Sequence, residues 1–152
     1  MVSFVEEADR RERICREILQ ALPQWFGIPE SIEEYAKNCR NLPFWAAEEK
    51  GAPAGFAAYR PTSPQAGEIY VMGVRREYHR KGLGRELFGE LYAHAKASGC
   101  QFLTVKTVRP GCYETYDRTN RFYRSLGFVE LECFPTLWDE ANPCQMYIMN
   151  VI

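Results

Sequence analysis

The segment from Val74 to Phe88 constrains this chain more than any other: Val-Arg-Arg-Glu-Tyr-His-Arg-Lys-Gly-Leu-Gly-Arg-Glu-Leu-Phe. An apolar run from Ile69 to Val74 leads into it and predicts a strand. A basic turn with two glycines follows, and an amphipathic helix begins directly after the turn. Glycines let main-chain N–H groups approach an anion closely, and a helix N-terminus carries roughly half a positive charge. The segment therefore predicts a strand–turn–helix unit that holds a phosphate-bearing ligand.

The composition makes this basic turn a local feature. The chain has 152 residues, of which 46% are hydrophobic and 26% charged, and its formal net charge is −1. These values suit one globular domain, residues 1–152, with a substantial core. A chain with this balance has no general attraction to nucleic acid, and its basic residues cluster in one turn without a wider positive face. We therefore expect no nucleic-acid partner.

Cysteine usage and hydropathy bear on metal binding and localisation. The six cysteines occur singly, without a Cys-x-x-Cys pair, and the chain has only two histidines, so we expect no metal site and reduced thiols. Residues 1–10 lack the apolar region of a secretory signal, and no apolar run approaches the length of a membrane span. The expectation is a cytoplasmic protein without a membrane partner.

Periodicity and turn residues predict a mixed α/β fold. Gly73, inside an apolar strand, indicates a bulge or a close backbone approach. Ser31 and Glu34 have the spacing of a capping box at the start of the second helix. The element order indicates a mixed sheet with helices on both faces. The predicted helices are 9–22, 31–40, 82–98 and 116–125, and the predicted strands are 44–48, 55–59, 68–74, 102–108, 128–134 and 145–151.

The two glycines by themselves fit several readings. A solvated loop before a helix is one of them. A dinucleotide fingerprint fits poorly, because Leu87 stands where the third glycine belongs, and a Walker loop would need Gly-Lys followed by Ser or Thr. Three basic side chains are placed to assist main-chain contacts to a pyrophosphate: Arg80, Lys81 and Arg85.

In its full context the segment resembles the acetyl-CoA signature of the GNAT N-acetyltransferases, Arg/Gln-x-x-Gly-x-Gly/Ala. Gly82 and Gly84 fall on the two small positions, and His79 stands where arginine or glutamine is usual. A second element, from Arg121 to Phe128 (Arg-Phe-Tyr-Arg-Ser-Leu-Gly-Phe), is similar to the family's Phe-Tyr-x-x-x-Gly-Phe. The resemblance implies a mostly antiparallel twisted sheet of about six to seven strands, splayed at the fourth strand. It also implies acetyl-CoA as cosubstrate.

The resemblance assigns roles to two parts of this segment. Main-chain groups at the strand splay would bind the pantetheine arm, and one N–H there would polarise the thioester carbonyl. Met72, Gly73 and Val74 occupy those positions. The turn would hold the pyrophosphate, which makes the cofactor-binding candidates His79, Arg80, Lys81, Gly82, Leu83, Gly84 and Arg85.

Two side chains are candidates for proton transfer. Tyr123 matches the family tyrosine near the departing thiolate, which must gain a proton as the intermediate collapses. Glu68 lies six residues before Val74, the spacing of a glutamate base in the histone-acetylating branch. A tyrosine buried for packing and a solvated carboxylate are the plainer readings, and a water chain is an alternative base. Tyr116 stands where many relatives carry a cofactor-binding asparagine, and Asn120 is out of register to replace it.

The sequence leaves the acceptor open. Trp25, Phe26, Tyr35 and Trp45 fall in segments that wall the acceptor site in relatives, and residues 109–117 offer an acidic, aromatic rim. The predicted function is transfer of an acetyl group from acetyl-CoA to a primary amine in a ternary complex. The alternative is a non-catalytic acyl-CoA-binding or regulatory module on the same fold. The apolar final strand, 146–152, is a candidate for pairing across a homodimer.

Overall fold

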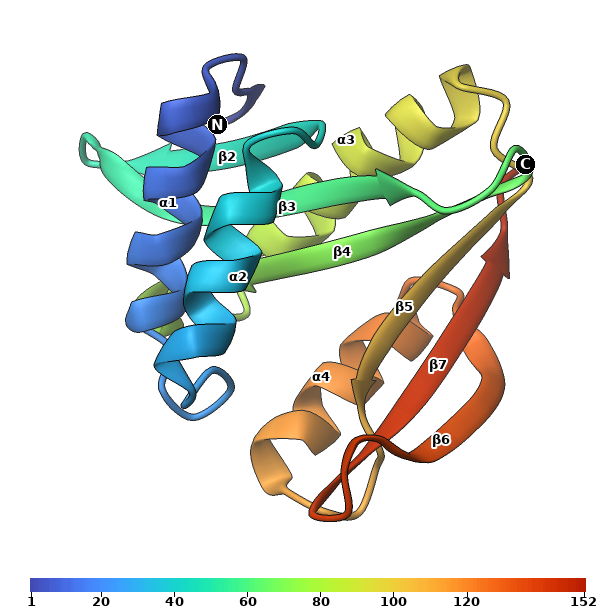
Figure 1. The fold of residues 1–152 in the computed structure, drawn as a ribbon. Helices are drawn as coiled ribbons and strands as arrows, with labels where there is room; N and C mark the ends of the chain where they lie inside the picture. The colour runs from blue at the N-terminus through green and yellow to red at the C-terminus, as the bar shows by residue number, and fades with distance from the viewer.

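The computed structural model describes residues 1–152 as a seven-stranded sheet with four α-helices and one short 3₁₀ helix, η1 (Figure 1). The strand order is β1-β2-β3-β4-β5-β7-β6, and every neighbouring pair is antiparallel except β4 and β5. The strands are β1 (Val2–Phe4), β2 (Phe44–Glu49), β3 (Ala52–Pro61), β4 (Ala66–Val74), β5 (Phe102–Val108), β6 (Val129–Asp139) and β7 (Asn142–Asn150). The helices are α1 (Ala8–Gln20), α2 (Pro29–Cys39), η1 (Arg76–Tyr78), α3 (Leu83–Ala97) and α4 (Glu114–Ser125). The mixed, mostly antiparallel fold expected from the sequence is confirmed.

Strands β2, β3 and β4 are buried on both faces over most of their length. Helices α1 and α2 cover one face, where Ile14, Ile18 and Phe56 belong to one apolar cluster. Helix α3 covers the other face, and its Leu87 and Leu91 belong to a second cluster. Each helix has one apolar stripe and turns it to the sheet, which removes that surface from water. This half of the protein therefore forms a rigid base for the elements that follow it.

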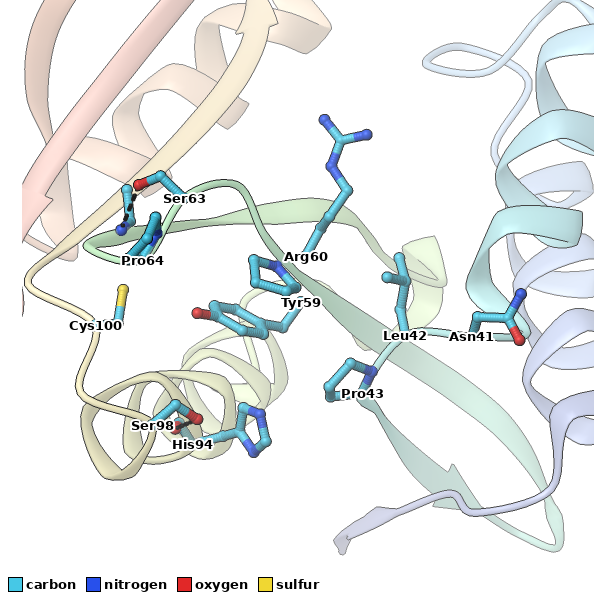
Figure 2. Close-up of a pocket in the computed structure, with 12 residues that line it drawn as sticks. Asn41, Leu42, Pro43, Tyr59, Arg60, Ser63, Pro64, His94, Ser98 and Cys100 are labelled. Carbon is cyan, nitrogen blue, oxygen red and sulfur yellow. Dashed lines mark hydrogen bonds between the residues drawn. The ribbon is translucent and has the colours of Figure 1, made fainter.

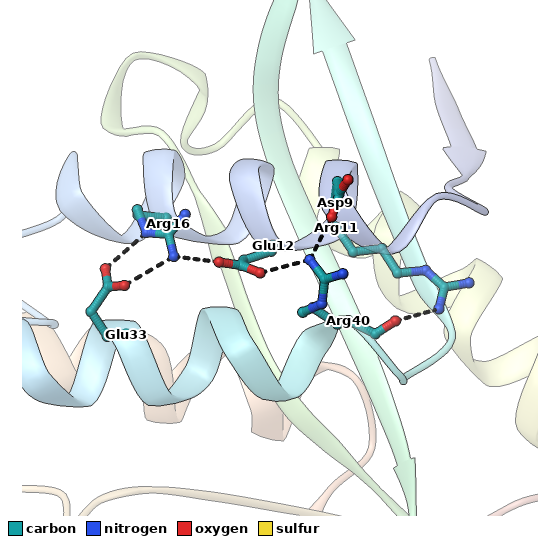
Figure 3. Close-up of polar contacts among 6 residues, drawn as sticks. All are labelled: Asp9, Arg11, Glu12, Arg16, Glu33 and Arg40. Atoms are coloured by element: carbon teal, nitrogen blue, oxygen red, sulfur yellow. Dashed lines mark hydrogen bonds and ion pairs between the residues drawn. The ribbon is translucent and has the colours of Figure 1, made fainter.

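Helices α1 and α2 are also joined by a polar network along their outer edge (Figure 3). The Arg16 guanidinium contacts Glu33 at 2.8 Å and Glu12 at 2.6 Å, and Arg40 contacts the other oxygen of Glu12 at 2.8 Å. Arg40 also reaches Asp9 at 2.6 Å. Exposed pairs of this kind contribute about 0.2–1 kcal/mol each, so the network fixes the helix register more than it adds stability.

The sheet divides between β4 and β5. The parallel ladder pairs only four residues of β4, from Ala66 to Ile69, with residues 102–105 of β5. Beyond it the strands diverge, so β5, β7 and β6 form a second half-sheet that carries α4 (Figure 1). The splay expected at the fourth strand is confirmed.

The structure differs from the sequence expectations at several boundaries. Strand β1 was not predicted, because three residues are too short to show a period. The second helix begins at Pro29, after Ile28, and the Ser31 N–H donates to the Ile28 carbonyl at 3.1 Å, so the predicted capping box does not form. Strand β7 pairs with β5 on one side and β6 on the other. It therefore has no free edge for pairing across a dimer. No helix in the structure has the length and apolar character needed to span a membrane.

Candidate functional site

A cleft of about 850 Å³ opens where β4 and β5 separate. Its origin is a bulge at Tyr70: Ala58 of β3 pairs with Val71 and Tyr59 pairs with Ile69, which leaves Tyr70 without a partner. A bulge bends and twists the strand that carries it, so β4 turns away from β5 directly after Ile69. The bulge predicted near Gly73 therefore lies three residues earlier in the chain.

The β4–α3 turn, residues 75–82, forms one end of the cleft. Arg80 and Gly82 both have left-handed backbones, with φ of 64° and 81°. None of the main-chain N–H groups from Arg80 to Arg85 donates to a backbone acceptor, and the first bond of α3 runs from the Glu86 N–H to the Gly82 carbonyl. Unbonded N–H groups in a left-handed turn at a helix N-terminus create a concave anion site. The turn thus has the main-chain geometry that a pyrophosphate needs.

The basic side chains of this turn are arranged less uniformly than its main chain. Arg80 and Arg85 line the cleft, and Arg85 Nη2 donates to Ser125 Oγ at 3.0 Å. Lys81 does not line the cleft, and its ammonium lies 5.7 Å from the centre of the Tyr78 ring. We therefore assign the direct anion contacts to the main chain and to the two arginines.

His79 also lines the cleft, but one ring nitrogen is already bonded. Its Nε2 lies 2.7 Å from the Val74 carbonyl, which closes the turn onto the end of β4. The imidazole also meets the Trp25 ring edge-on, with centroids 5.7 Å apart. His79 therefore holds the turn in place, and only its Nδ1 atom is free for a ligand.

Three glycines, Gly73 in β4 and Gly82 and Gly84 in the signature, are accommodated for different structural reasons. A Cβ on Gly82 would meet nothing within 4 Å, so this glycine serves the left-handed backbone. A Cβ on Gly84 would lie 3.1 Å from Phe122 Cζ, so this glycine lets α3 approach α4. A Cβ on Gly73 would meet Leu22 and Ile18 of the α1 segment at 3.1 and 3.2 Å. The close approach predicted at Gly73 is therefore made by a helix.

The end of β4 supplies free main-chain groups. Met72, Gly73 and Val74 all line the cleft. The Arg75 N–H donates to the Ala54 carbonyl of β3, and the Val74 carbonyl accepts from His79 on the opposite side. Successive residues of a strand alternate in the direction of their N–H and C=O groups. The main-chain groups of Met72 and Val74 therefore face the cleft, and those of Gly73 face β3.

Tyr123 lies on α4 with its hydroxyl at the cleft. The side chain packs against the rings of Phe122, Phe128 and Tyr147, and only 6% of the residue is exposed. No protein group bonds its hydroxyl, and the oxygen is not sealed from solvent, because no fully buried side-chain atom lacks a partner. Burial raises the pKa of this phenol well above its usual value. The arrangement keeps a protonated donor at the cleft wall.

The Glu68 carboxylate is not free to accept a proton from a substrate, because both of its oxygens contact cations. Its carboxylate is 5% exposed, forms an ion pair with Arg60, and accepts a hydrogen bond from Lys106 Nζ at 3.2 Å. Glu68 does not line the cleft, whereas Lys106 does. Both carboxylate oxygens are therefore engaged by cations, and the side chain reaches the cleft only through Lys106.

Asn120 is part of the protein interior, as its sequence register suggested. It is 1% exposed, and its side-chain amide donates to the carbonyls of Val108 at 2.9 Å and Tyr116 at 2.7 Å. Its carbonyl accepts from the Tyr147 hydroxyl. The residue joins α4 to β5 and β7, and it is buried outside the lining of the cleft.

The connection between α1 and α2, residues 21–28, crosses from one half of the protein to the other. Trp25 Nε1 donates to Thr119 Oγ1 of α4 at 3.1 Å, and the Tyr116 hydroxyl donates to the Trp25 carbonyl at 2.5 Å. Since Trp25 also contacts His79, this connection contacts both the β4–α3 turn and α4. It forms a strap across the cleft.

Aromatic side chains dominate the rest of the cleft, from Trp25 beside the turn to Tyr35 and Tyr70 near the bulge. Three of the four aromatic residues predicted near an acceptor line it, namely Trp25, Phe26 and Tyr35, and burial raises the pKa of Tyr35 to about 12. Trp45 is instead buried under α3, 5.3 Å from the His94 ring. Of the predicted rim at 109–117, only Tyr116 reaches the cleft. Phe122, of the Phe-Tyr element, also lines the cleft, and three further lining residues carry no signal in the sequence: Tyr70, Lys106 and Trp138.

A second hollow, of about 460 Å³, lies at the far end of β3 (Figure 2). Tyr59 and His94 enter it from β3 and α3, with ring centroids 5.3 Å apart, and Cys100 lies beside them. Burial lowers the pKa of His94. None of the predicted catalytic or cofactor-binding residues lines this hollow, so the site is the cleft between β4 and β5.

Comparison with known proteins agrees with this geometry. The model of the acetyltransferase (GNAT) family matches residues 7–128. An uncharacterised N-acetyltransferase of Chlorobaculum tepidum is 26% identical over 120 residues, which cover 77% of this chain and 70% of that protein.

Solved structures share the fold along the whole chain. A protein described as a GNAT-family acetyltransferase from Desulfovibrio desulfuricans superposes with a TM-score of 0.83 at 22% identity, covering 100% of both chains. An aminoglycoside 6′-N-acetyltransferase complexed with coenzyme A superposes with a TM-score of 0.81 at 15% identity, covering 100% of this chain and 97% of the other. At these identities the likeness concerns the fold.

Proposed function

Because this chain belongs to the GNAT acetyltransferase family, we propose that it transfers the acetyl group of acetyl-CoA directly to a primary amine in a ternary complex. One observation carries the proposal: Arg80 and Gly82 to Arg85, whose main-chain N–H groups donate to no backbone acceptor, line the same cleft as Tyr123, whose hydroxyl has no protein partner. The first group suits a pyrophosphate, and the second suits a departing thiolate.

The cofactor would lie along the splay. The turn holds the pyrophosphate, and the pantetheine arm follows the part of β4 that β5 no longer pairs. Main-chain groups of Met72 and Val74 would bind its amides as a neighbouring strand does. The arm thereby takes the place of the missing strand and brings the thioester to the bulge.

The amine would attack the thioester carbonyl from the aromatic end of the cleft. A carbon–nitrogen bond forms, and the carbonyl oxygen takes the negative charge, which a main-chain N–H of β4 stabilises. The intermediate collapses by breaking the carbon–sulfur bond, and Tyr123 donates its proton to the departing thiolate. The nitrogen, which becomes positively charged on attack, gives its extra proton to water, and the phenolate is reprotonated from solvent, which leaves a neutral amide and a thiol.

The amine must lose a proton before it attacks, since an amine of pKa near 10 is only about one part in a thousand neutral at pH 7. Glu68 is the sequence candidate for this base, but its oxygens are bonded to Arg60 and Lys106. Water in the cleft is the better acceptor for the proton. We therefore infer that Glu68 acts by holding Lys106 in position.

Replacing Tyr123 with phenylalanine tests the mechanism. We expect kcat to fall by about 100-fold or more, since general acid catalysis contributes about 10²–10⁴-fold, with little change in the Kd for acetyl-CoA. Calorimetry measures the Kd, and thiol release with an amine panel measures kcat. Tyr92→Phe is the matched control, because the Tyr92 hydroxyl bonds Ile152 outside the cleft.

Two results would contradict the proposal. Full turnover by the Tyr123 variant would remove this residue from the mechanism. Binding of acetyl-CoA without turnover for any amine would instead favour a non-catalytic acyl-CoA-binding module on the same fold.

A further inference from the structure

The charged side chains that line the cleft all have the same sign. Its lining contains no aspartate or glutamate. The ionised lining side chains are all cationic: Arg76, Arg80, Arg85, Lys106, Arg118 and Arg121. Such a surface repels ammonium groups and attracts carboxylates or phosphates.

Three carboxylates near the cleft are already engaged, and a fourth, Glu34, lies on α2 beside Tyr35 but does not line the cleft. Glu68 is shared by Arg60 and Lys106. Asp117 Oδ1 accepts from the Gly111 N–H at 2.7 Å, and Glu114 pairs with Arg118 at 3.4 Å. An acceptor with several ammonium groups would therefore find no carboxylate in the lining of the cleft, and each ammonium group left unpaired there would carry a desolvation cost.

The cations fall into two groups with different uses. Arg76, Arg80 and Arg85 belong to the β4–α3 turn and the start of α3, where the proposed function places the pyrophosphate. Lys106 lies on β5, beyond the last residue of the parallel ladder, on the floor of the cleft. Its partner Glu68 lies near the start of β4, whereas the turn follows the end of β4. Phosphates held at the turn therefore do not account for Lys106.

Lys106 has bonding capacity left. Its ammonium group carries three N–H donors, and the structure uses one of them, for Glu68. Arg60 also contacts Glu68 and lies over the Tyr70 ring, 5.0 Å from its centre, so two cations share one carboxylate. The cluster of Arg60, Glu68 and Lys106 therefore carries one net positive charge next to the bulge.

Aromatic rings line the same cleft as this ammonium. Tyr35 meets Tyr70 edge-on with centroids 5.4 Å apart, and Phe26 meets Tyr35 in the same way at 6.0 Å. With Trp25 and Tyr116 these rings make an amphipathic wall that favours a planar or bulky apolar group. The acceptor end thus combines a cation with an aromatic wall.

We propose that the acceptor is an amine that also carries a carboxylate and an aromatic or bulky apolar group, an α-amino acid being the simplest case. The carboxylate binds Lys106, the apolar group packs on the rings, and the amine is left to face the thioester. This inference rests on the proposed function, and it excludes polyamines and aminoglycosides as preferred acceptors.

Matched acceptors test this inference. L-Phenylalanine and L-tryptophan are compared with phenethylamine and tryptamine, which lack only the carboxylate, and with spermidine. Thiol release at saturating acetyl-CoA gives kcat/KM, and mass spectrometry identifies the acetylated product. We expect kcat/KM to be at least tenfold higher for each amino acid than for its decarboxylated partner, and lowest for spermidine.

Lys106→Met should reduce this preference to near unity without changing the Kd for acetyl-CoA. Lys106→Arg keeps the charge and should retain most of the preference, which shows that the fold tolerates change at this position. Lys96→Met removes a lysine from the exposed side of α3 and should leave the preference unchanged.

The failures of the two proposals are distinguishable. Higher kcat/KM for spermidine or for the decarboxylated amines, or a carboxylate preference that persists in Lys106→Met, would overturn this inference and leave the acetyltransferase proposal standing. Binding of acetyl-CoA without turnover of any acceptor would overturn both.

Discussion

The two ends of the cleft are built in different ways. The end at the β4–α3 turn consists mainly of main-chain groups from one continuous segment, Arg80–Arg85, positioned by two left-handed residues. The opposite end consists of side chains from the α1–α2 connection, α2, β4, β5 and α4. One end is local in sequence, and the other is assembled only by the topology.

The difference indicates what each end recognises. Main-chain N–H groups present the same chemistry whatever the neighbouring side chains are, which suits a ligand of fixed structure such as a pyrophosphate. A site of separate side chains changes its ligand whenever one of them changes. We therefore expect substitutions at the turn to affect acetyl-CoA binding, and substitutions at the aromatic end to affect the acceptor.

Among substitutions that test this division, the largest effect on ligand binding should come from Gly82→Ala. A side chain in a left-handed backbone costs about 1–2 kcal/mol, so the turn is expected to shift and its N–H groups to lose their alignment. We predict an approximately tenfold rise in the Kd for acetyl-CoA, which calorimetry measures, since tenfold corresponds to about 1.4 kcal/mol.

Gly99→Ala is the matched control for this change. Gly99 has φ of 83° and open space around its Cβ position, as Gly82 does, but it lies after the end of α3. Both variants should lose similar thermal stability, and only Gly82→Ala should lose affinity. Equal affinities would show that the turn does not hold the cofactor.

A smaller effect is expected from Trp25→Phe at the strap. This change removes the N–H donor to Thr119 and retains most of the apolar surface. A net hydrogen bond contributes about 0.5–1.5 kcal/mol, so we predict a three- to tenfold rise in the acceptor KM at unchanged acetyl-CoA affinity. If the cofactor Kd rises instead, the strap belongs to the donor end and the division of the cleft is wrong.

The smallest effect concerns pH. Burial raises the pKa of Tyr123 above the usual value near 10, and an acid with a raised pKa keeps its proton to higher pH. As a proton donor it therefore remains competent throughout the range in which amines lose their proton. We predict that kcat/KM rises with pH and does not fall again below about pH 10. A falling limb at lower pH that disappears in Tyr123→Phe would contradict this.

The donor end could be predicted well because its signals are local. Glycine spacing, a helix start and an apolar strand lie within one segment. The amino-acid order alone is therefore enough to locate residues His79 to Arg85, which include the end of the β4–α3 turn and the start of α3. Even there, tertiary contacts decide individual roles: His79 bonds Val74, Lys81 lies outside the cleft, and Gly84 accommodates Phe122.

The acceptor end could not be predicted in the same way. Lys106 and Trp138 have no motif around them, and only the splay and the β6–β7 hairpin bring them to the cleft. Glu68 is the reverse case: its spacing suggests a base, whereas only the structure shows that Arg60 and Lys106, its neighbours across the sheet, contact its oxygens. Contacts between distant strands are set by register, which a single sequence does not display.

The short parallel ladder between β4 and β5 has a consequence for the lifetime of the protein in a cell. Within the sheet, four paired residues of β4 join the half-sheets, and in the proposed function the cosubstrate would complete the rest of that edge. A ligand that binds only the folded state stabilises it by about 2.7 kcal/mol when present at 100 times its Kd. We therefore expect the resistance of this protein to proteolysis, and so its abundance, to follow the supply of acetyl-CoA.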